Sequence, residues 1–355
     1  MTKKAAVCLF LAIICLFSGV GCSKDENIPD ASSPEVNDQI QIGITFDSYI
    51  IERWIRDRDV FVATASDLGA EVNVQNANGN VEEQRSQIEY FIRKDMDVIV
   101  IIAVDCDTLA EEIKKAQDAD IKIIAYDRLI RKADVDLYVS FDNAEVGRLM
   151  GESLVTNLPG GGNVFAINGP TSDNNVLMIQ DGFKSAIANS GIVIVYTDYC
   201  DGWKSDLAFA SVNRGLEKTM DVSAVMCGND DLATQAFRAL AENRMADKVI
   251  LVGQDADLAA CQRIVEGTQA MTVYKPVDDL AKAAAEYAVR LAKGEPLDTT
   301  EIINDGKNSV PYYALKPIAV TKKNIDKVII DSGFHLREDV YLNVKQEVDE
   351  SEETS

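Results

Sequence analysis

The chain has 355 residues, of which 47% are hydrophobic, and its formal net charge at pH 7 is −23. About 300 ordered residues with this apolar content suffice for two hydrophobic cores. An exterior this acidic disfavours nucleic acids and anionic membrane surfaces as partners, whereas it does not restrict an uncharged ligand.

The first 21 residues have the organisation of an export signal. Lys3 and Lys4 precede an apolar run that is too short for a safe membrane span, and small residues follow as a cleavage zone. Cys22 comes next, as in bacterial lipoproteins, where this thiol carries a lipid. Gly19 stands where that pattern usually has leucine, so ordinary secretion with Cys22 as a plain thiol is the alternative. We expect a polar tether over 22–39, and loss of the signal changes the net charge from −23 to −25.

From residue 40 onward, short β-branched runs alternate with longer amphipathic stretches. The run at 98–102 is apolar at every position, as expected for a strand that is covered on both faces. Repeated β-α-β units predict parallel sheets with right-handed crossovers. The predicted strands are 40–45, 71–75, 98–102, 121–125, 137–141, 163–167, 193–196, 224–227, 249–252 and 270–273, and the helical stretches include 88–93, 108–119, 144–158, 232–242 and 258–267.

The number of strands predicts two lobes rather than one sheet. Ten strands are many for one open sheet, and the alternation of strand-like and helical segments is interrupted near residue 142. We therefore predict an α/β fold of two Rossmann-like lobes with parallel sheets, joined by a multi-strand hinge. The expected bounds are 40–142 with 277–306 for the first lobe, 143–276 with 307–336 for the second, and 337–355 for a solvated, disordered acidic tail.

Both tryptophans of the chain are preceded in the sequence by charged residues. Trp54 follows Glu52 and Arg53, and Trp203 follows Asp201 and a glycine. Indole rings flanked by hydrogen-bonding groups suit a sugar, because its C–H faces stack on the rings while its hydroxyls pair with the polar groups. The alternative is two large residues buried at helix starts.

Charged or amide side chains follow seven of the predicted strands. In open parallel sheets ligands bind beyond the carboxyl ends of strands, so two facing lobes would gather these groups around one site. Many of them are also ordinary helix N-caps, but the cations Arg128 and Lys275 cannot cap an N-terminus. The groups at these strand ends include Asp47, Arg53, Asp127, Arg128, Asp173, Asn175, Asp201, Asn229, Gln254, Asp255, Asp257 and Lys275.

Several chemistries have no support in the sequence. His335 is the only histidine and stands late in the chain, where we expect it to lie away from the strand-end groups. This disfavours catalytic triads and histidine-based metal sites, and no phosphate-binding glycine loop is present. The mature chain has no CxxC pair, so we expect buried free thiols at Cys106, Cys200, Cys227 and Cys261 and leave a disulfide open.

Paired acids would permit a glycosidase, but the nearby cations favour binding. Arg53, Arg128 and Lys275 should hold the cleft acids ionised, which suits hydrogen-bond acceptance better than proton donation. We therefore expect no catalytic residue, no cofactor and no metal.

Long segments of the chain resemble the bacterial periplasmic D-xylose-binding proteins of ABC transport, which have the type I periplasmic binding protein fold. The likeness runs from about residue 40 to about residue 334. Departures at 169–172 and 226–228 leave the fine sugar preference open. The matching segments are IGI at 42–44, ERWIRDRD at 52–59, VQNANGN at 74–80, AYDR at 125–128, SFDN at 140–143, GQDADL at 253–258 and MTVYKP at 271–276.

The resemblance implies a site and a function. A sugar ring would lie between Trp54 and Trp203. The protein would be a monomer, held at the periplasmic side or cell surface by its lipid, that captures xylose or a close aldopentose and delivers it to an ABC permease. A receptor kinase is the alternative partner, while a transcription regulator and a glycosidase are weaker alternatives. The sugar hydroxyls would be held by Arg53, Asp127, Arg128, Asp173, Asn175, Asn229, Asp255 and Lys275.

Overall fold

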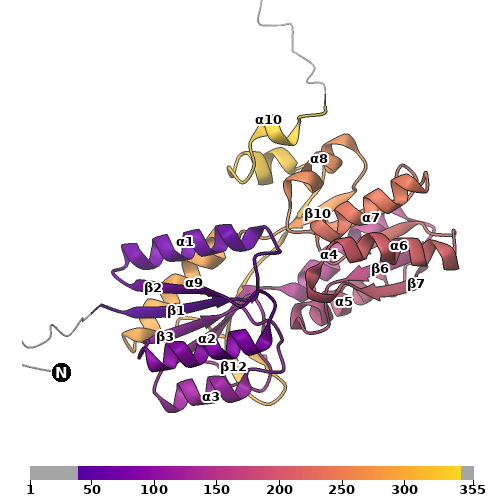
Figure 1. Ribbon diagram of the computed structural model, residues 1–355. Helices are drawn as coiled ribbons and strands as arrows, with labels where there is room; N and C mark the ends of the chain where they lie inside the picture. The colour runs from indigo at the N-terminus through magenta and orange to yellow at the C-terminus, as the bar shows by residue number, and fades with distance from the viewer. Residues whose placement is uncertain (1–38, 345–355) are drawn as a thin grey trace, which may run out of the picture. The chain divides into compact units, whose positions relative to one another are not determined.

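Two separate β-sheets, each flanked by helices, organise the part of the chain that the computed structural model describes, residues 39–344 (Figure 1). The predicted export signal, Cys22 and all but the last residue of the predicted tether lie outside these residues. The chain crosses between the sheets after β5, after β10 and after β12. The predicted fold class, two α/β lobes with largely parallel sheets, is confirmed.

The first sheet has seven strands in the order β11-β12-β5-β4-β3-β1-β2. All neighbours are parallel except β11 and β12, which form an antiparallel pair. We call this sheet and its helices the first lobe. Its strands are β1 (Gln41–Phe46), β2 (Glu71–Asn76), β3 (Val98–Ile101), β4 (Lys122–Tyr126), β5 (Leu137–Phe141), β11 (Glu301–Asn304) and β12 (Ser309–Leu315), and its helices are α1 (Arg53–Asp67), α2 (Val81–Arg93), α3 (Ala110–Asp118) and α9 (Val277–Ala292).

The second sheet has six strands in the order β13-β10-β9-β8-β6-β7, all parallel except β13. We call this sheet and its helices the second lobe. Its strands are β6 (Gly162–Asn168), β7 (Ile192–Tyr199), β8 (Ala224–Cys227), β9 (Ile250–Gln254), β10 (Met271–Tyr274) and β13 (Ile318–Val320), and its helices are α4 (Asn143–Asn157), α5 (Asn174–Ile187), η1 (Asp201–Trp203), α6 (Asp206–Lys218), α7 (Asp230–Glu242), α8 (Leu258–Glu266), η2 (Asp326–Ile330) and α10 (Arg337–Val340).

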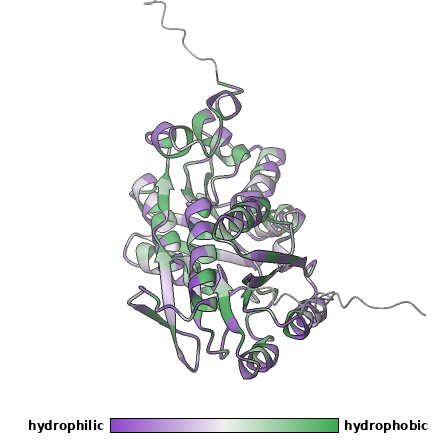
Figure 2. Cartoon of the chain, turned by 90° about the vertical axis from the view of Figure 1, so that its left-hand side faces the viewer, coloured by the Kyte–Doolittle hydropathy of each residue, from purple (hydrophilic) through white to green (hydrophobic). Residues whose placement is uncertain are grey.

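The apolar run of β3 shows why the central strands lack polar alternation. Val98 and Val100 belong to the core beneath α1 and α9, whereas Ile99 and Ile101 belong to the core beneath α2 and α3. Side chains of a strand alternate between faces, so a strand covered on both sides must be apolar throughout. The helices instead mix hydrophilic and hydrophobic residues along their ribbons, as expected when only one face is covered (Figure 2).

All ten predicted strands are present, with shifts of a few residues at some ends, but β11, β12 and β13 were not predicted. The expected second-lobe bound at residue 307 is wrong for β12, because Tyr312 to Leu315 pair with Tyr138 to Phe141 of the first sheet. Strands that pair across 174 residues leave no local sequence signal. The chain therefore leaves the first sheet only after Leu315.

The acidic tail also begins later than predicted. Residues 337–344 include helix α10, and Val340 is fully buried against Cys261 and Ile264 of α8. These apolar contacts order a segment whose composition is mostly polar. Residues 345–355 lie outside the described part of the chain. Within residues 39–344, no helix has both the length and the apolar character that a membrane span needs.

Candidate ligand-binding site

One small cavity, which we call the inner cavity, brings all the predicted ligand residues together at the carboxyl ends of strands from both sheets. The centre of a water molecule can reach about 20 Å³ of it. A compact cavity of that size has a radius of about 3 Å once the water radius is added, which suits one small ring. It is lined by Arg53, Trp54, Asp127, Arg128, Asp173, Asn175, Trp203, Asn229, Asp255 and Lys275, together with Ile51, Asn143 and Gln254.

Trp54 lies in the first turn of α1 and serves both the core and the cavity. It is 1% exposed and packs edge-on against Phe46. The guanidinium carbon of Arg53 lies 4.4 Å from the centre of its ring, and that of Arg128 lies 5.7 Å away. The alternative of a buried tryptophan at a helix start is therefore also correct, since the same ring lines the cavity.

Trp203 reaches the cavity from the short η1 turn of the second lobe. Its backbone is left-handed, with φ of 58°, and its indole Nε1 donates to Asp173 Oδ2 at 3.2 Å. Two glycines make room for the ring: a Cβ at Gly169 would lie 2.3 Å from the indole, and one at Gly228 would lie 3.2 Å from it. Both glycines lie in the segments 169–172 and 226–228, where we expect departures from the D-xylose-binding pattern.

Arg53 is held by two buried carboxylates. Its Nε and Nη2 donate to Asp57 over 3.2 and 2.9 Å, and its Nη2 lies 3.0 Å from Asp127 Oδ2. The Tyr126 hydroxyl also donates to Asp57. An arginine has many rotamers, so paired contacts of this kind fix the plane of its guanidinium group.

Arg128 joins the two lobes. Its Nη1 donates to Asp47 at 2.8 Å and to the carbonyl of Ala103 at 2.9 Å, within the first lobe. Its Nε lies 2.9 Å from Asp173 Oδ2 of the second lobe. Asn175 makes a second link, since its amide donates to Asp127 Oδ1 at 3.1 Å. These polar contacts therefore span the gap between the lobes at the cavity wall.

The remaining groups come from the second lobe. Lys275 Nζ lies 2.7 Å from Asp255 Oδ1 at the end of β10. Asn229 accepts from the backbone N–H of Leu232 at 2.9 Å and so caps α7, as its position before a helix suggested. Capping uses one oxygen and leaves the amide nitrogen of Asn229 for a ligand.

The carboxylates of the cavity differ in their pKa. Burial would raise the pKa of Asp127, but Arg53, Lys275 and Arg128 together hold it below its ordinary value. For Asp173 burial outweighs the effect of Arg128, and its pKa is raised. The expectation that cations favour the ionised form therefore holds most clearly for Asp127, which is suited to accept hydrogen bonds from hydroxyls.

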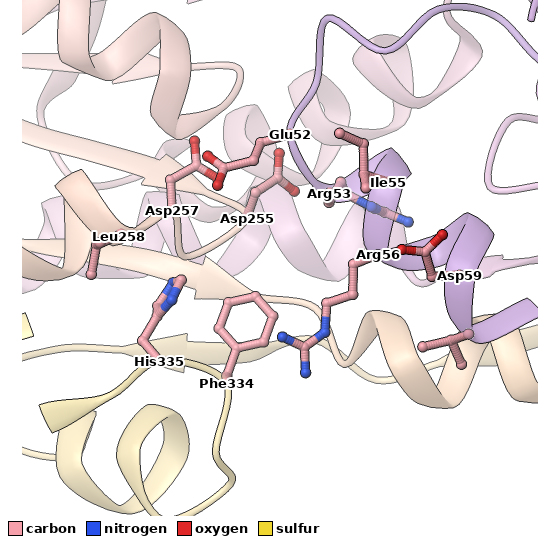
Figure 3. A pocket seen from close by; sticks show the side chains of 11 residues that line it. Glu52, Arg53, Ile55, Arg56, Asp59, Asp255, Asp257, Leu258, Phe334 and His335 are labelled. Atoms are coloured by element: carbon pink, nitrogen blue, oxygen red, sulfur yellow. The ribbon is translucent and has the colours of Figure 1, made fainter. Parts of the chain in front are cut away.

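A wider pocket, which we call the outer pocket, borders the inner cavity and shares Arg53 and Asp255 with it (Figure 3). By the same measure its volume is about 480 Å³. His335 lines this pocket, and its Nε2 lies 2.8 Å from the carbonyl of Ala256. The prediction that His335 lies away from the strand-end groups is therefore wrong, because the C-terminal segment folds back beside the end of β9.

The cysteines of the described residues, Cys106, Cys200, Cys227 and Cys261, are free and buried, as expected. Within residues 39–344, one group brings metal-ligating atoms close together: Asp105, Cys106 and Asp107. Burial raises the pKa of the Cys106 thiol to about 11, and Arg131 pairs with Asp107. A protonated thiol beside an already paired carboxylate is a poor metal ligand.

Three residues of the inner cavity were absent from the predicted set: Ile51, Asn143 and Gln254. Asn143 and Gln254 carry the signal used for the others, since both closely follow predicted strands. The supporting carboxylate Asp57 has no such signal, because its role depends on burial beside Arg53.

These features define a two-lobed ligand-binding protein whose site is assembled from both lobes. Residues 42–296 match the model of the periplasmic binding protein domain, and the chain belongs to this family. It is 41% identical to a D-xylose-binding periplasmic protein of Haemophilus influenzae, over 96% of this chain and 100% of that one. It is 42% identical to a D-xylose-binding periplasmic protein of Escherichia coli, over 84% and 91% of the two chains.

A solved structure shares the architecture. An ABC transporter solute-binding protein from Clostridium phytofermentans, solved with β-D-glucose, superposes with a TM-score of 0.78 at 27% identity. The superposition covers 84% of this chain and 99% of that one. The likeness therefore extends over nearly the whole described part of the chain.

Proposed function

We propose that the protein is an extracytoplasmic solute-binding protein that captures D-xylose or a close aldopentose and delivers it to an ABC sugar transporter. The observation that carries this proposal is the inner cavity. Two indole rings, one from each lobe, line it together with three cations and three carboxylates. The D-xylose-binding relatives support the choice of sugar, and the solute-binding structure supports the transporter as partner.

Sugar capture would couple binding to lobe closure. A ring in the inner cavity touches Arg53 and Trp54 of the first lobe and Asp255 and Trp203 of the second only when the lobes are together. A ligand that bridges both lobes therefore favours the closed form over an open one. A membrane permease that recognises the closed form would receive only loaded protein.

The proposal excludes catalysis as the main activity. A general acid needs a pKa near the working pH, and the cations around Asp127 lower its pKa instead. Burial raises the pKa of Asp173, but this carboxylate is already engaged by Arg128 and by the indole N–H of Trp203. Release of reducing sugar from xylo-oligosaccharides would contradict this part of the proposal. A sensor kinase is the second candidate partner; binding of the sugar-loaded protein to a kinase ectodomain rather than to a permease would favour it.

The decisive experiment is a titration of the purified protein with xylose, ribose, arabinose and glucose, followed by tryptophan fluorescence and calorimetry. We expect xylose to bind with a dissociation constant of about 1 μM or below, since charge-assisted hydrogen bonds and stacking on two rings both contribute. No response to any of the four sugars would overturn the proposal.

We further propose that Cys22 carries a lipid that anchors the protein to a membrane of the cell envelope, on the periplasmic side or at the cell surface. The export signal and the cysteine behind it support this anchor. We expect the full-length protein to partition into detergent in a Triton X-114 separation and Cys22→Ala to stay in the aqueous phase. Equal partitioning of both proteins would contradict the anchor and leave sugar binding untouched.

A further inference from the structure

The turn that carries Asp255 has an unusual backbone. It joins β9 to α8, and both Asp255 and Ala256 are left-handed, with φ of 96° and 57°. Residues with a Cβ avoid this region unless their surroundings hold them there. Asp255 is also one of the cavity residues and pairs with Lys275, so the conformation of this turn sets the position of a ligand-facing carboxylate.

Two buried side chains hold the turn from inside the second lobe. The Thr272 hydroxyl accepts from the Ala256 N–H at 3.1 Å and donates to Asp230 at 2.5 Å. Asp230 also accepts from the N–H of Asp257 at 3.3 Å and from Gln269 at 2.9 Å. Thr272 and Asp230 are both fully buried, so water cannot replace these hydrogen bonds.

His335 holds the same turn from outside. Its Nε2 lies 2.8 Å from the Ala256 carbonyl, which can only accept, so the imidazole donates through Nε2. Figure 3 shows His335 beside Phe334 on the C-terminal segment, close to the turn that bears Asp255 and Asp257. Burial lowers the pKa of His335, which favours the neutral ring that carries this single donor.

Backbone polar groups of three consecutive residues in the turn have hydrogen-bond partners. The N–H of Asp255 pairs with the carbonyl of Val273 at 2.8 Å, and Thr272, His335 and Asp230 take the polar groups that follow. None of these three side chains lines the inner cavity. Their shared target is therefore the turn itself rather than a ligand.

We infer that Thr272, Asp230 and His335 are positioning residues for sugar binding, which hold the strained turn so that Asp255 meets the ligand without rearrangement. This inference rests on the proposed function, since it assigns the three residues to the same site. A turn that is already in its binding conformation spares the ligand the free energy of ordering it.

A double-mutant cycle with Thr272→Val and Asp255→Ala tests whether Thr272 acts through Asp255. Valine has nearly the same shape as threonine and replaces the hydroxyl with a methyl group that forms no hydrogen bond. We expect Thr272→Val to weaken xylose binding about tenfold in the unmodified protein, and by less than about twofold when Asp255 is already alanine. Equal weakening in both backgrounds would show a general structural effect and overturn the inference.

Thr45→Val is the matched control, because Thr45 is also fully buried and hydrogen-bonded, to Gln87 at 2.7 Å in the first lobe. It should reduce stability to a similar degree and leave xylose affinity within about twofold. Equal loss of affinity in both variants would overturn the inference. Failure of the unmodified protein to bind any sugar would instead overturn the proposed function, so the two failures are distinguishable.

Amide hydrogen exchange gives a readout that does not depend on measurable binding by Asp255→Ala. In the sugar-free protein, Thr272→Val should speed exchange in the turn 255–257 by about tenfold, and Thr45→Val should not. His335→Ala should act in the same direction, and His335→Gln, which keeps a donor, should restore part of the protection. Unchanged exchange of the turn in Thr272→Val would overturn the inference.

Discussion

The two lobes hold the side chains that line the inner cavity by different means. In the first lobe, buried carboxylates orient long cations: Asp57 pairs with Arg53, and Asp47 pairs with Arg128. In the second lobe, Trp203 and Asp255 stand on left-handed backbone, as Asp127 does in the first. Close glycine contacts support Trp203, and Asp255 pairs with Lys275 on a turn that is held by hydrogen bonds from buried side chains.

The difference follows from the side chains. An arginine has several rotatable bonds, so its head group must be fixed by partners near its tip. Aspartate and tryptophan have only two rotatable bonds, and their position depends mainly on the backbone that carries them. We therefore expect substitutions that break an ion pair to have their largest effect on the first-lobe side of the site. Substitutions that disturb the contacts of the backbone should have their largest effect on the second-lobe side.

The largest effect is expected when the first-lobe ion pair is broken. Asp57→Ala leaves Arg53 buried with one carboxylate fewer, and loss of one partner of a buried pair costs about 3–5 kcal/mol of unfolding free energy. Urea unfolding measures this loss, and sugar affinity should fall with it. The control is Asp59→Ala on the same helix, whose partner Arg58 lies near the surface and whose effect should stay within about 1 kcal/mol. Similar losses in both variants would contradict the comparison.

In the second lobe, removal of the Trp203 ring should lower affinity first. Trp203→Ala takes away one of the two indole faces, and we expect xylose binding to weaken by well over about tenfold. The ring is 5% exposed and belongs to the core beneath α6 and α7, so stability falls as well. Affinity must therefore be measured per folded molecule. Retained affinity in the folded fraction would show that Trp203 is only a core residue.

A smaller and more selective change tests the glycine contact below that ring. In Gly169→Ala the new Cβ would lie 2.3 Å from the indole of Trp203, so the ring must shift from its position at the inner cavity. We expect about tenfold weaker binding, seen by titration, with a blue or red shift of the tryptophan emission. Gly160→Ala is the control, because no atom lies within 4 Å of its new Cβ. Equal affinities in the two variants would contradict a role for the Gly169 contact.

Local patterns in the sequence predict much of this molecule. The apolar run at 98–102 predicts a strand that is covered on both faces. The polar groups that follow seven strands predict most of the residues that line the inner cavity. These predictions succeed because strand ends of parallel sheets meet at one edge. Knowledge of the two lobes and of strand ends is then enough to gather residues that lie up to 222 positions apart, such as Arg53 and Lys275.

Features that depend on long-range pairing could not be predicted in this way. Strand β12 joins the first sheet through β5, and His335 returns to the end of β9 from a segment without apolar periodicity. The supporting carboxylates Asp57 and Asp230 look like ordinary helix-face and helix-start residues in the sequence. Only burial beside a specific partner gives them their roles, and burial of polar groups is not encoded in local spacing.

A pH dependence of stability also separates the two kinds of support. Burial raises the pKa of Asp230 to about 7, against hydrogen bonds from Thr272 and Gln269 that lower it. In the unfolded chain an aspartate has a pKa of about 3.9, so the folded state holds the Asp230 proton more tightly. The contribution of Asp230 to stability is therefore fully present below about pH 4 and is lost as the pH rises towards about 7.

Asp305 in the first lobe should behave in the opposite way. Burial would raise its pKa, but backbone N–H groups including that of Asn308 hold it at about 2. Its contribution is present above about pH 4 and is lost as the pH falls towards about 2. Unfolding free energies measured from pH 3 to pH 8 should therefore decline on both sides of a maximum at about pH 4.

We attribute the loss of stability on the alkaline side of the maximum to Asp230. Asp230→Asn should flatten the decline between pH 5 and pH 7, because the amide does not titrate there, and should leave the acid side unchanged. Asp206→Asn is the control, since Asp206 occupies the first turn of α6 as Asp230 occupies that of α7, but is exposed. A decline that persists in Asp230→Asn would mean that Asp230 does not carry the proton. The neutral hydrogen bonds of the second lobe would then support an ionised carboxylate, and the contrast between the lobes would reduce to Trp203 and its glycines.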